Sequence, residues 1–105
     1  MKIMIHKIKL KEIKSLSDFR DWVLTTDYLA CHDLPSVLQF DVIEVSTDKN
    51  ADFHFIEVIR LSSLAEFEKD MNSPLFNSLE SRFNEMAQVV EENEGDLIGN
   101  GYSSF

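Results

Sequence analysis

Cysteine, proline and glycine are scarce in this chain, and so are long apolar runs. The 105 residues include one cysteine, two prolines and three glycines, and no apolar run approaches the roughly 20 residues that a membrane-spanning helix needs. Cys31 has no second cysteine to pair with, which is typical of a reducing compartment, so we expect a cytoplasmic protein without a membrane span. Lysines interrupt the first aliphatic segment, which argues against a signal peptide, so we expect the mature chain to start at or near Met1.

Basic residues are scarce as well. The chain has 10 lysines and arginines against 19 aspartates and glutamates, a formal net charge of −9. Because nucleic-acid binding depends on basic side chains that replace counterions along the phosphates, DNA and RNA are poor candidates for partners. Lysines gather in residues 2–14 and carboxylates in residues 91–96. We interpret them as two solvated faces, and the alternative is a surface that steers a charged partner.

Apolar material is sufficient for one folded domain. Hydrophobic residues make up 44% of the chain, and the sequence shows no internal repeat or low-complexity segment. We therefore predict a single domain over residues 1–105.

The first half of the sequence predicts a strand, a helix and a second strand. Residues 2–10 alternate with the period of two that is typical of strands. A capping box at Ser15 and Asp18 predicts the start of a helix, whose apolar positions recur at helical spacing up to Ala30. Pro35 ends this helix because it disfavours helical geometry at the preceding residue.

The second half predicts a hairpin, two helical segments and a last strand. Strands at 36–46 and 53–61 are joined by the polar turn TDKNAD, which favours an antiparallel hairpin. Ser63 with Glu66 predicts one helix start, and Ser73 with Pro74 predicts a second. We expect the second helix to continue to Gly95. Residues 96–105 then supply the last strand, with Gly99 and Gly101 suggesting a bulge or a close backbone approach.

This order of elements is the ferredoxin-like βαββαβ arrangement of the α+β class, in which one antiparallel sheet carries both helices on a single face. The predicted strands carry apolar residues on both faces, whereas a sheet solvated on one side should alternate apolar with polar. We therefore predict a homodimer in which two sheets pack face to face as a dimeric α/β barrel.

A carboxylate in the middle of the apolar strand FHFIEVIRL indicates a candidate site. If the hairpin turns around residue 49, Asp41 lies opposite Glu57. His6 on the neighbouring strand can then reach Glu57 from the same face. Such a cluster of titratable side chains is typical of a general acid–base site. The alternative is that both carboxylates see solvent near a sheet edge and His6 bonds a backbone carbonyl. A slip of one residue would send the carboxylates to opposite faces.

Metal and cofactor signatures are lacking. His32 and His54 are weaker candidates, because neither is spaced with a second ligand as in zinc motifs, so we assign no metal. Cys31 carries no nucleophile signature and is better interpreted as a small buried thiol. The chain has no phosphate loop, dinucleotide fingerprint or nucleophile elbow, so we assign no cofactor.

Five segments in combination resemble a known family: DYLACHDLPSV, FDVIEVS, FHFIEVIRLSS, FEKDMNSPLF and the final GY. The chain resembles, over essentially its full length, the RedY-like/HapK family of prodigiosin-type pigment pathways. The resemblance implies a dimeric α/β barrel and a place in bacterial tripyrrole pigment biosynthesis, on the branch that makes the methoxy-bipyrrole carbaldehyde. Related members work on bisindole intermediates.

Proton transfer on an electron-rich heteroaromatic is the simplest chemistry for such a chain. In this hypothesis His6, Asp41 and Glu57 move protons at a pyrrole N–H or hydroxyl group. Two alternatives stay open. The protein can be a carrier that shields a bipyrrole intermediate, or a cofactor-independent monooxygenase, since the same barrel hosts such enzymes.

Aromatic side chains are the candidates for holding the flat rings of a small-molecule pyrrole intermediate. The candidates are Trp22, Tyr28, Phe55 and Tyr102. Each is also compatible with an ordinary place in the core or at its rim.

Overall fold

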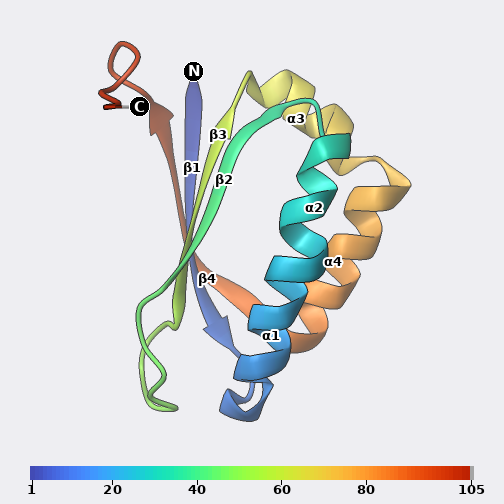
Figure 1. The fold of residues 1–105 in the computed structure, drawn as a ribbon, viewed down its shortest axis with the longest axis vertical. Helices are drawn as coiled ribbons and strands as arrows, with labels where there is room; N and C mark the ends of the chain where they lie inside the picture. The colour runs from blue at the N-terminus through green and yellow to red at the C-terminus, as the bar shows by residue number, and fades with distance from the viewer. Residues whose placement is uncertain (105) are drawn as a thin grey trace.

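The computed structural model describes residues 1–104, which form a four-stranded antiparallel sheet with helices on one side (Figure 1). The strands are β1 (Lys2–Leu10), β2 (Val37–Glu44), β3 (Phe55–Leu61) and β4 (Ala87–Asp96). Their order across the sheet is β2-β3-β1-β4. The predicted ferredoxin-like α+β fold is therefore confirmed, and the bounds of its first three strands agree with the prediction within two residues.

Two helical runs cover the sheet. The run between β1 and β2 comprises η1 (Ile13–Ser15), α1 (Leu16–Trp22), the π-helical segment η2 (Val23–Asp27), α2 (Tyr28–Ala30) and η3 (Cys31–Asp33). The run between β3 and β4 comprises α3 (Leu64–Met71) and α4 (Pro74–Met86). Among the described residues, no helix combines the length and apolar character needed to cross a bilayer.

The helices α1, α3 and α4 begin directly after Ser15, Ser63 and Ser73, as the sequence predicts, and the side-chain caps at Ser63 and Ser73 are confirmed. The Ser63 hydroxyl accepts a hydrogen bond from Glu66 N at 3.1 Å, and the Ser73 hydroxyl accepts one from Phe76 N at 3.1 Å. Each bond satisfies one of the backbone donors that a helix start leaves unpaired. The predicted capping box at Ser15 is wrong, because its side chain makes no cap hydrogen bond and a 3₁₀ turn leads into α1 instead.

The last strand lies earlier than the sequence predicts. Helix α4 ends at Met86 instead of continuing to Gly95, and β4 occupies Ala87–Asp96 instead of 96–105. Phe105 lies outside the described residues. Gly99 and Gly101 follow the strand and adopt left-handed backbone angles, with φ of 59° and 67°. They form part of a turn, and the register shifts of the sheet lie in the β1–β4 and β2–β3 pairings instead.

Ion pairs between neighbouring strands explain this position of β4. Lys2 lies opposite Asp96 and Lys7 lies opposite Glu91 in the β1–β4 pairing, and both pairs have nitrogen–oxygen distances of 3.0 Å. Opposite charges placed across two strands stabilise their pairing. The basic and acidic segments are therefore adjacent strands instead of two separate solvated faces.

The core consists of two groups of buried side chains with a polar level between them. The larger group, here the Ile8 cluster, lies at one end of the sheet and includes Ile8, Leu10, Phe19, Trp22, Phe55 and Met86. The smaller group, here the Met4 cluster, lies toward the other end and comprises Met4, Ile59, Leu61 and Phe67. On β1 and β3, His6 and Glu57 occupy the positions between the two clusters.

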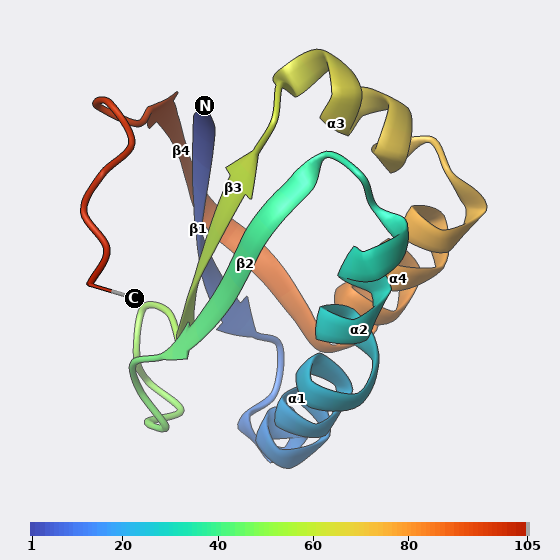
Figure 2. The ribbon, with the colours of Figure 1, turned by 45° about the horizontal axis from the view of Figure 1, so that its top comes forward.

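The opposite face of the sheet, here the open face, is not covered by a helix of the described chain (Figure 2). Apolar residues of three strands occupy it. In the register, Ile5 pairs with Val58 and Ile43 pairs with Ile56. Ile5 is 38% exposed and Ile43 is 46% exposed. The open face thus combines exposed aliphatic side chains with the absence of helical cover in residues 1–104.

His54 holds the β2–β3 loop against the end of β1. It is 1% exposed, and its Nδ1 accepts a hydrogen bond from Leu10 N at 3.0 Å while its Nε2 donates to Asp48 O at 2.9 Å. Its backbone N also donates to Ile8 O at 2.8 Å. Because an amide can only donate and a carbonyl can only accept, the imidazole is neutral with its proton on Nε2. His54 therefore has a structural role.

We expect His54→Leu to lower the free energy of unfolding by about 2 to 3 kcal/mol, because it leaves the buried Leu10 N and the Asp48 carbonyl without partners. Urea denaturation measures the change. His32→Leu is the matched control, since His32 is exposed and its loss should change stability by no more than about 0.5 kcal/mol. Equal stability of the two variants would contradict the structural role of His54.

Candidate functional site

β1 and β3 bring an imidazole and a carboxylate together in the middle of the sheet. His6 and Glu57 are direct cross-strand partners, and His6 Nδ1 donates to Glu57 Oε1 at 2.7 Å. Each side chain is only 14% exposed. The hydrogen bond to Glu57 raises the pKa of His6, and the opposing effect of burial is smaller. The pair therefore favours the imidazolium form more than a free histidine does.

Glu92 on β4 lies on the other side of the imidazole. Its Oε2 is 3.5 Å from His6 Nε2, and its side chain is 54% exposed. His6 Nε2 is buried and has no hydrogen-bond partner among the described residues. The bulge in the β1–β4 pairing lies between Lys7 and Ile8, close to this contact, and bulges commonly re-aim side chains next to functional sites. The three side chains thus form a row across β3, β1 and β4.

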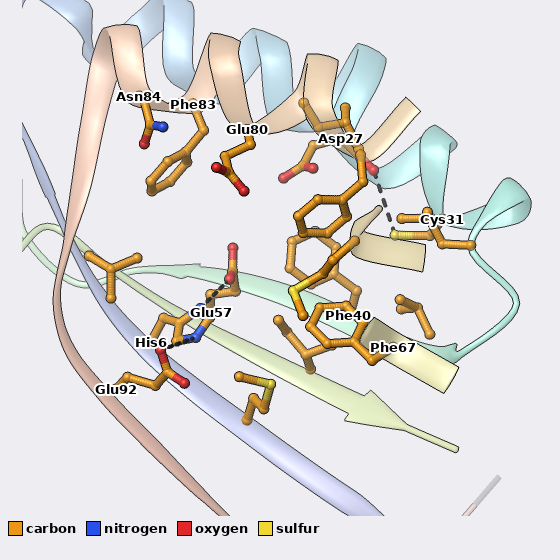
Figure 3. A pocket seen from close by; sticks show the side chains of 18 of the residues that line it. His6, Asp27, Cys31, Phe40, Glu57, Phe67, Glu80, Phe83, Asn84 and Glu92 are labelled. Atoms are coloured by element: carbon orange, nitrogen blue, oxygen red, sulfur yellow. Dashed lines mark hydrogen bonds and ion pairs between the residues drawn. The ribbon is translucent and has the colours of Figure 1, made fainter. Parts of the chain in front are cut away.

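A cavity of about 410 Å³ lies between this row and the helices (Figure 3), within the size range of small-molecule sites. Aromatic and aliphatic side chains form most of its wall, including Met4, Trp22, Phe40, Ile59, Phe67, Phe76 and Phe83. The acidic lining residues are Asp27, Glu57, Glu80 and Glu92. Among the described residues, the lining includes no lysine or arginine. This lining favours a flat apolar ligand that donates N–H groups or carries positive charge.

Asp27 lies on the helical wall of the cavity because the first helical run contains a π-helical segment. A regular helix following Trp22 and Val23 would turn Thr26 toward the sheet, because residues three and four positions apart share one face of an α-helix. The π segment Val23–Asp27 adds a residue to the turn. Thr26 is therefore exposed, Leu29 is 59% exposed, and Asp27 is turned inward.

Burial controls the protonation of two groups on this wall, Asp27 and Cys31. It raises the pKa of Asp27 to about 7, with a further contribution from the negative charge of Glu57. It also raises the pKa of Cys31 to about 11, so Cys31 remains a thiol at neutral pH, but the residue is half-buried instead of buried as predicted. Its Sγ donates to Asp27 O at 3.6 Å.

The predicted pairing of Asp41 with Glu57 is wrong. The observed register pairs Asp41 with Val58 and Val42 with Glu57, one residue away from the prediction. Asp41 therefore lies on the open face, is exposed, and accepts a hydrogen bond from Gln39 Nε2 at 2.8 Å. Because successive strand side chains alternate between faces, a shift of one residue removes Asp41 from the His6–Glu57 pair.

The four aromatic candidates occupy different places. Trp22 lines the cavity. Phe55 is 3% exposed and packs in the Ile8 cluster with its ring 4.6 Å from that of Phe19. The Tyr28 hydroxyl accepts a hydrogen bond from Val42 N at 2.9 Å, and Tyr28 lines a separate, more open depression. Tyr102 is 91% exposed. Among them, only Trp22 lies in the wall of the cavity with the acid–imidazole pair.

No group of three or more histidine, cysteine or acidic side chains among the described residues is arranged to hold a metal ion. His32 is exposed within η3, and the ring of His54 makes two hydrogen bonds to backbone groups. The polar chemistry of the cavity is therefore carried by the row of Glu57, His6 and Glu92 together with Asp27.

The protein thus has a ferredoxin-like fold whose sheet holds an acid–imidazole pair in the wall of an aromatic cavity. The family model described as REDY-like protein HapK matches residues 2–98. The chain belongs to this family, in agreement with the resemblance seen in its sequence motifs.

Solved structures agree with this assignment. HapK from Hahella chejuensis is 42% identical, with a TM-score of 0.98 and full coverage of both chains. SnoaB, a cofactor-independent oxygenase from Streptomyces nogalater, has a TM-score of 0.69 at 7% identity over 94% of each chain. A DABB family protein from Mesorhizobium loti has a TM-score of 0.56 at 16% identity over 96% of this chain and 100% of its own. The last two share the fold alone. No curated protein matches the sequence.

We expect Asp27→Asn to stabilise the protein at alkaline pH. The folded chain holds the Asp27 proton more tightly than the unfolded chain, so Asp27 lowers the free energy of unfolding as the pH rises from 3.8 to about 7. Asparagine does not ionise and removes this loss. The free energy of unfolding of the variant should be higher by about 2 kcal/mol at about pH 8 and by much less at about pH 4. This gain is smaller than the whole pKa shift would give, because the cavity is open to solvent.

Urea denaturation at the two pH values measures the difference. Asp21→Asn is the matched control, since Asp21 is an exposed carboxylate of the same helical run and its change should show no such pH dependence. A gain for Asp27→Asn that is equal at both pH values would contradict the raised pKa.

Proposed function

We propose that this protein acts on a bipyrrole intermediate of a prodigiosin-type pigment pathway, on the branch that leads to the methoxy-bipyrrole carbaldehyde, by acid–base chemistry without a cofactor. Membership in the HapK family supports a role in biosynthesis. The observation that carries the chemistry is the His6–Glu57 hydrogen bond of 2.7 Å in the wall of an aromatic cavity.

Glu57 is the proton acceptor in this proposal. Its Oε1 accepts from His6, whereas its Oε2 has no hydrogen-bond partner among the described residues. Figure 3 shows its carboxyl group directed from the sheet toward the helical wall. A pyrrole N–H or a hydroxyl group held against the sheet would therefore meet the free oxygen of Glu57. A base must lie within hydrogen-bond reach of the proton that it takes.

His6 supports Glu57 in two ways. Its imidazole orients the carboxylate through Nδ1, and its raised pKa lets it share or take up the proton. Its Nε2 is 3.5 Å from Glu92, which is partly in solvent. A proton can thus leave the cavity through His6 and Glu92 while the ligand is bound. The aromatic wall meanwhile holds the flat rings in one orientation.

We expect Glu57→Gln and His6→Ala each to reduce conversion of the bipyrrole intermediate by at least about 100-fold, because each removes a group that handles the proton. Conversion is followed by mass spectrometry, with circular dichroism to verify folding. Asp41→Asn is the control, since Asp41 is a carboxylate on the adjacent strand but on the open face, and it should keep full activity. Folded variants with unchanged conversion would refute the acid–base mechanism.

A carrier that shields the intermediate is the second candidate, favoured by the predominantly apolar wall of the cavity. The two functions differ when the purified protein is incubated with the bipyrrole intermediate. A change in the mass of the intermediate indicates catalysis, and tight binding without such a change indicates a carrier. Consumption of oxygen during the reaction would indicate a monooxygenase instead.

The proposal includes a homodimer formed through the open face. Exposed aliphatic side chains on adjacent strands, Ile5 and Ile43 among them, support it. If two such faces packed together, each would shield the other from water. Large exposed apolar patches on soluble proteins commonly mark such interfaces.

We expect Ile5→Lys to convert the dimer to a monomer, because a lysine at this position would place an unpaired charge in the interface. Sedimentation velocity at micromolar concentration measures the change. Leu24→Lys is the control, since Leu24 is 63% exposed on the helical layer, and it should remain dimeric. An unmodified protein that sediments as a monomer would refute the homodimer.

A further inference from the structure

Two carboxyl groups that the acid–base mechanism described above does not use line the cavity, the exposed Glu80 and the largely buried Asp27. Asp27 is turned inward from the π segment of the first helical run. Figure 3 shows its side chain on the helical wall, across the cavity from the His6–Glu57 pair. No hydrogen bond or ion pair joins the Asp27 carboxyl group to another described residue. A largely buried carboxyl group without a protein partner is available to a ligand.

The backbone supports a functional reason for this placement. A π turn has poorer geometry than a regular turn, and such turns occur frequently at functional sites. Here its effect is to replace Thr26, which a regular helix would turn inward, with Asp27. A threonine hydroxyl would satisfy itself on a helix carbonyl, as Thr25 does by donating to Asp21 O at 2.7 Å. The Asp27 carboxyl group makes no such bond to its own helix in the described structure and is directed at the cavity.

The two carboxyl groups differ in what they can bind. Glu57 accepts a hydrogen bond from His6 through Oε1, and its Oε2 is available as an acceptor for N–H groups of a ligand. Asp27 has no cation beside it, and no lysine or arginine lines the described cavity. Groups with opposed hydrogen-bonding roles on facing walls recognise a ligand with a donor edge and an acceptor edge.

We propose that Asp27 donates a hydrogen bond to an oxygen acceptor of the ligand while Glu57 accepts from the ligand's N–H edge on the opposite wall. This inference rests on the proposed function and adds a specificity to it: the cavity selects N–H heteroaromatic rings that carry a carbonyl oxygen. A site built to pair with such an atom discriminates strongly against analogues that lack it.

The protonation of Asp27 accords with this role. Burial and the charge of Glu57 raise its pKa to about 7, so it holds a proton below this pH and can donate it. The titratable groups that line the cavity with it are His6 on β1, Glu57 on β3, Glu80 on α4, Glu92 on β4 and, one turn further along its own helical run, Cys31. Cys31 keeps its proton and Glu57 keeps its imidazole partner, so the donor capacity should be lost as Asp27 ionises.

The test compares the affinities of two probes, 2,2′-bipyrrole-5-carbaldehyde and 2,2′-bipyrrole, which differ only in the carbonyl group. Fluorescence titration of the intact protein at about pH 6 and about pH 8.5 gives the affinity ratio. Because the proposed contacts of the N–H edge are the same for both probes, any pH dependence of those contacts cancels in this ratio. We expect the unmodified protein to prefer the aldehyde about tenfold at the lower pH and to lose most of this preference at the higher pH.

The variants separate the donor from the shape of the side chain. Asp27→Ala should show no preference at either pH, and Asp27→Asn should keep a preference at both, because its amide donates without ionising. Thr26→Ala, the exposed neighbour, should behave as the unmodified protein. If Asp27→Ala keeps the pH-dependent preference, or if the unmodified protein shows none, the inference about Asp27 is wrong while the proposed function stands. If neither probe binds the unmodified protein, both are wrong.

Discussion

The cross-strand hydrogen bond between His6 and Glu57 organises the rest of this structure. A carboxylate on the covered face of a sheet is tolerated only if it has a partner, and the imidazole of the adjacent strand supplies one. The pair also separates the Met4 cluster from the Ile8 cluster, because apolar side chains gain nothing by packing over a charged pair. The helices therefore do not close down on the sheet at this level, and the cavity lies where the core is interrupted.

Periodicity and strand order are sufficient to predict the fold and half of the site. The period of two places His6 and Glu57 on one face, and the ferredoxin-like order places their strands side by side. The β2–β3 register is a different matter, because it depends on an irregular loop. His54 O accepts from both Val45 N at 2.9 Å and Ser46 N at 3.3 Å, which no turn signal in TDKNAD indicates. The error of one residue that follows removes Asp41 from the site.

Asp27 and Glu92 were missed for two separate physical reasons. Asp27 was missed because helical periodicity assumes 3.6 residues per turn, and the π segment has a wider turn. No glycine or proline in the segment indicates this change in the sequence. Glu92 belongs to the segment EENEG, which has little strand propensity and reads as the end of a helix. Its strand pairing is supported by ion pairs to β1, which local propensity does not register. The charge pattern could have predicted this strand, since lysines in one strand favour carboxylates in the strand that pairs with it.

The charge of β4 also limits how the sheet can grow. β4 is an outer strand of the sheet, and its outer edge offers unpaired backbone groups to any extended segment that approaches. The strand carries four carboxylates within ten residues, Glu91, Glu92, Glu94 and Asp96. An incoming strand of the same chain would bring its own excess of negative charge against them. The acidic strand thus protects the protein from adding copies edge to edge into larger aggregates.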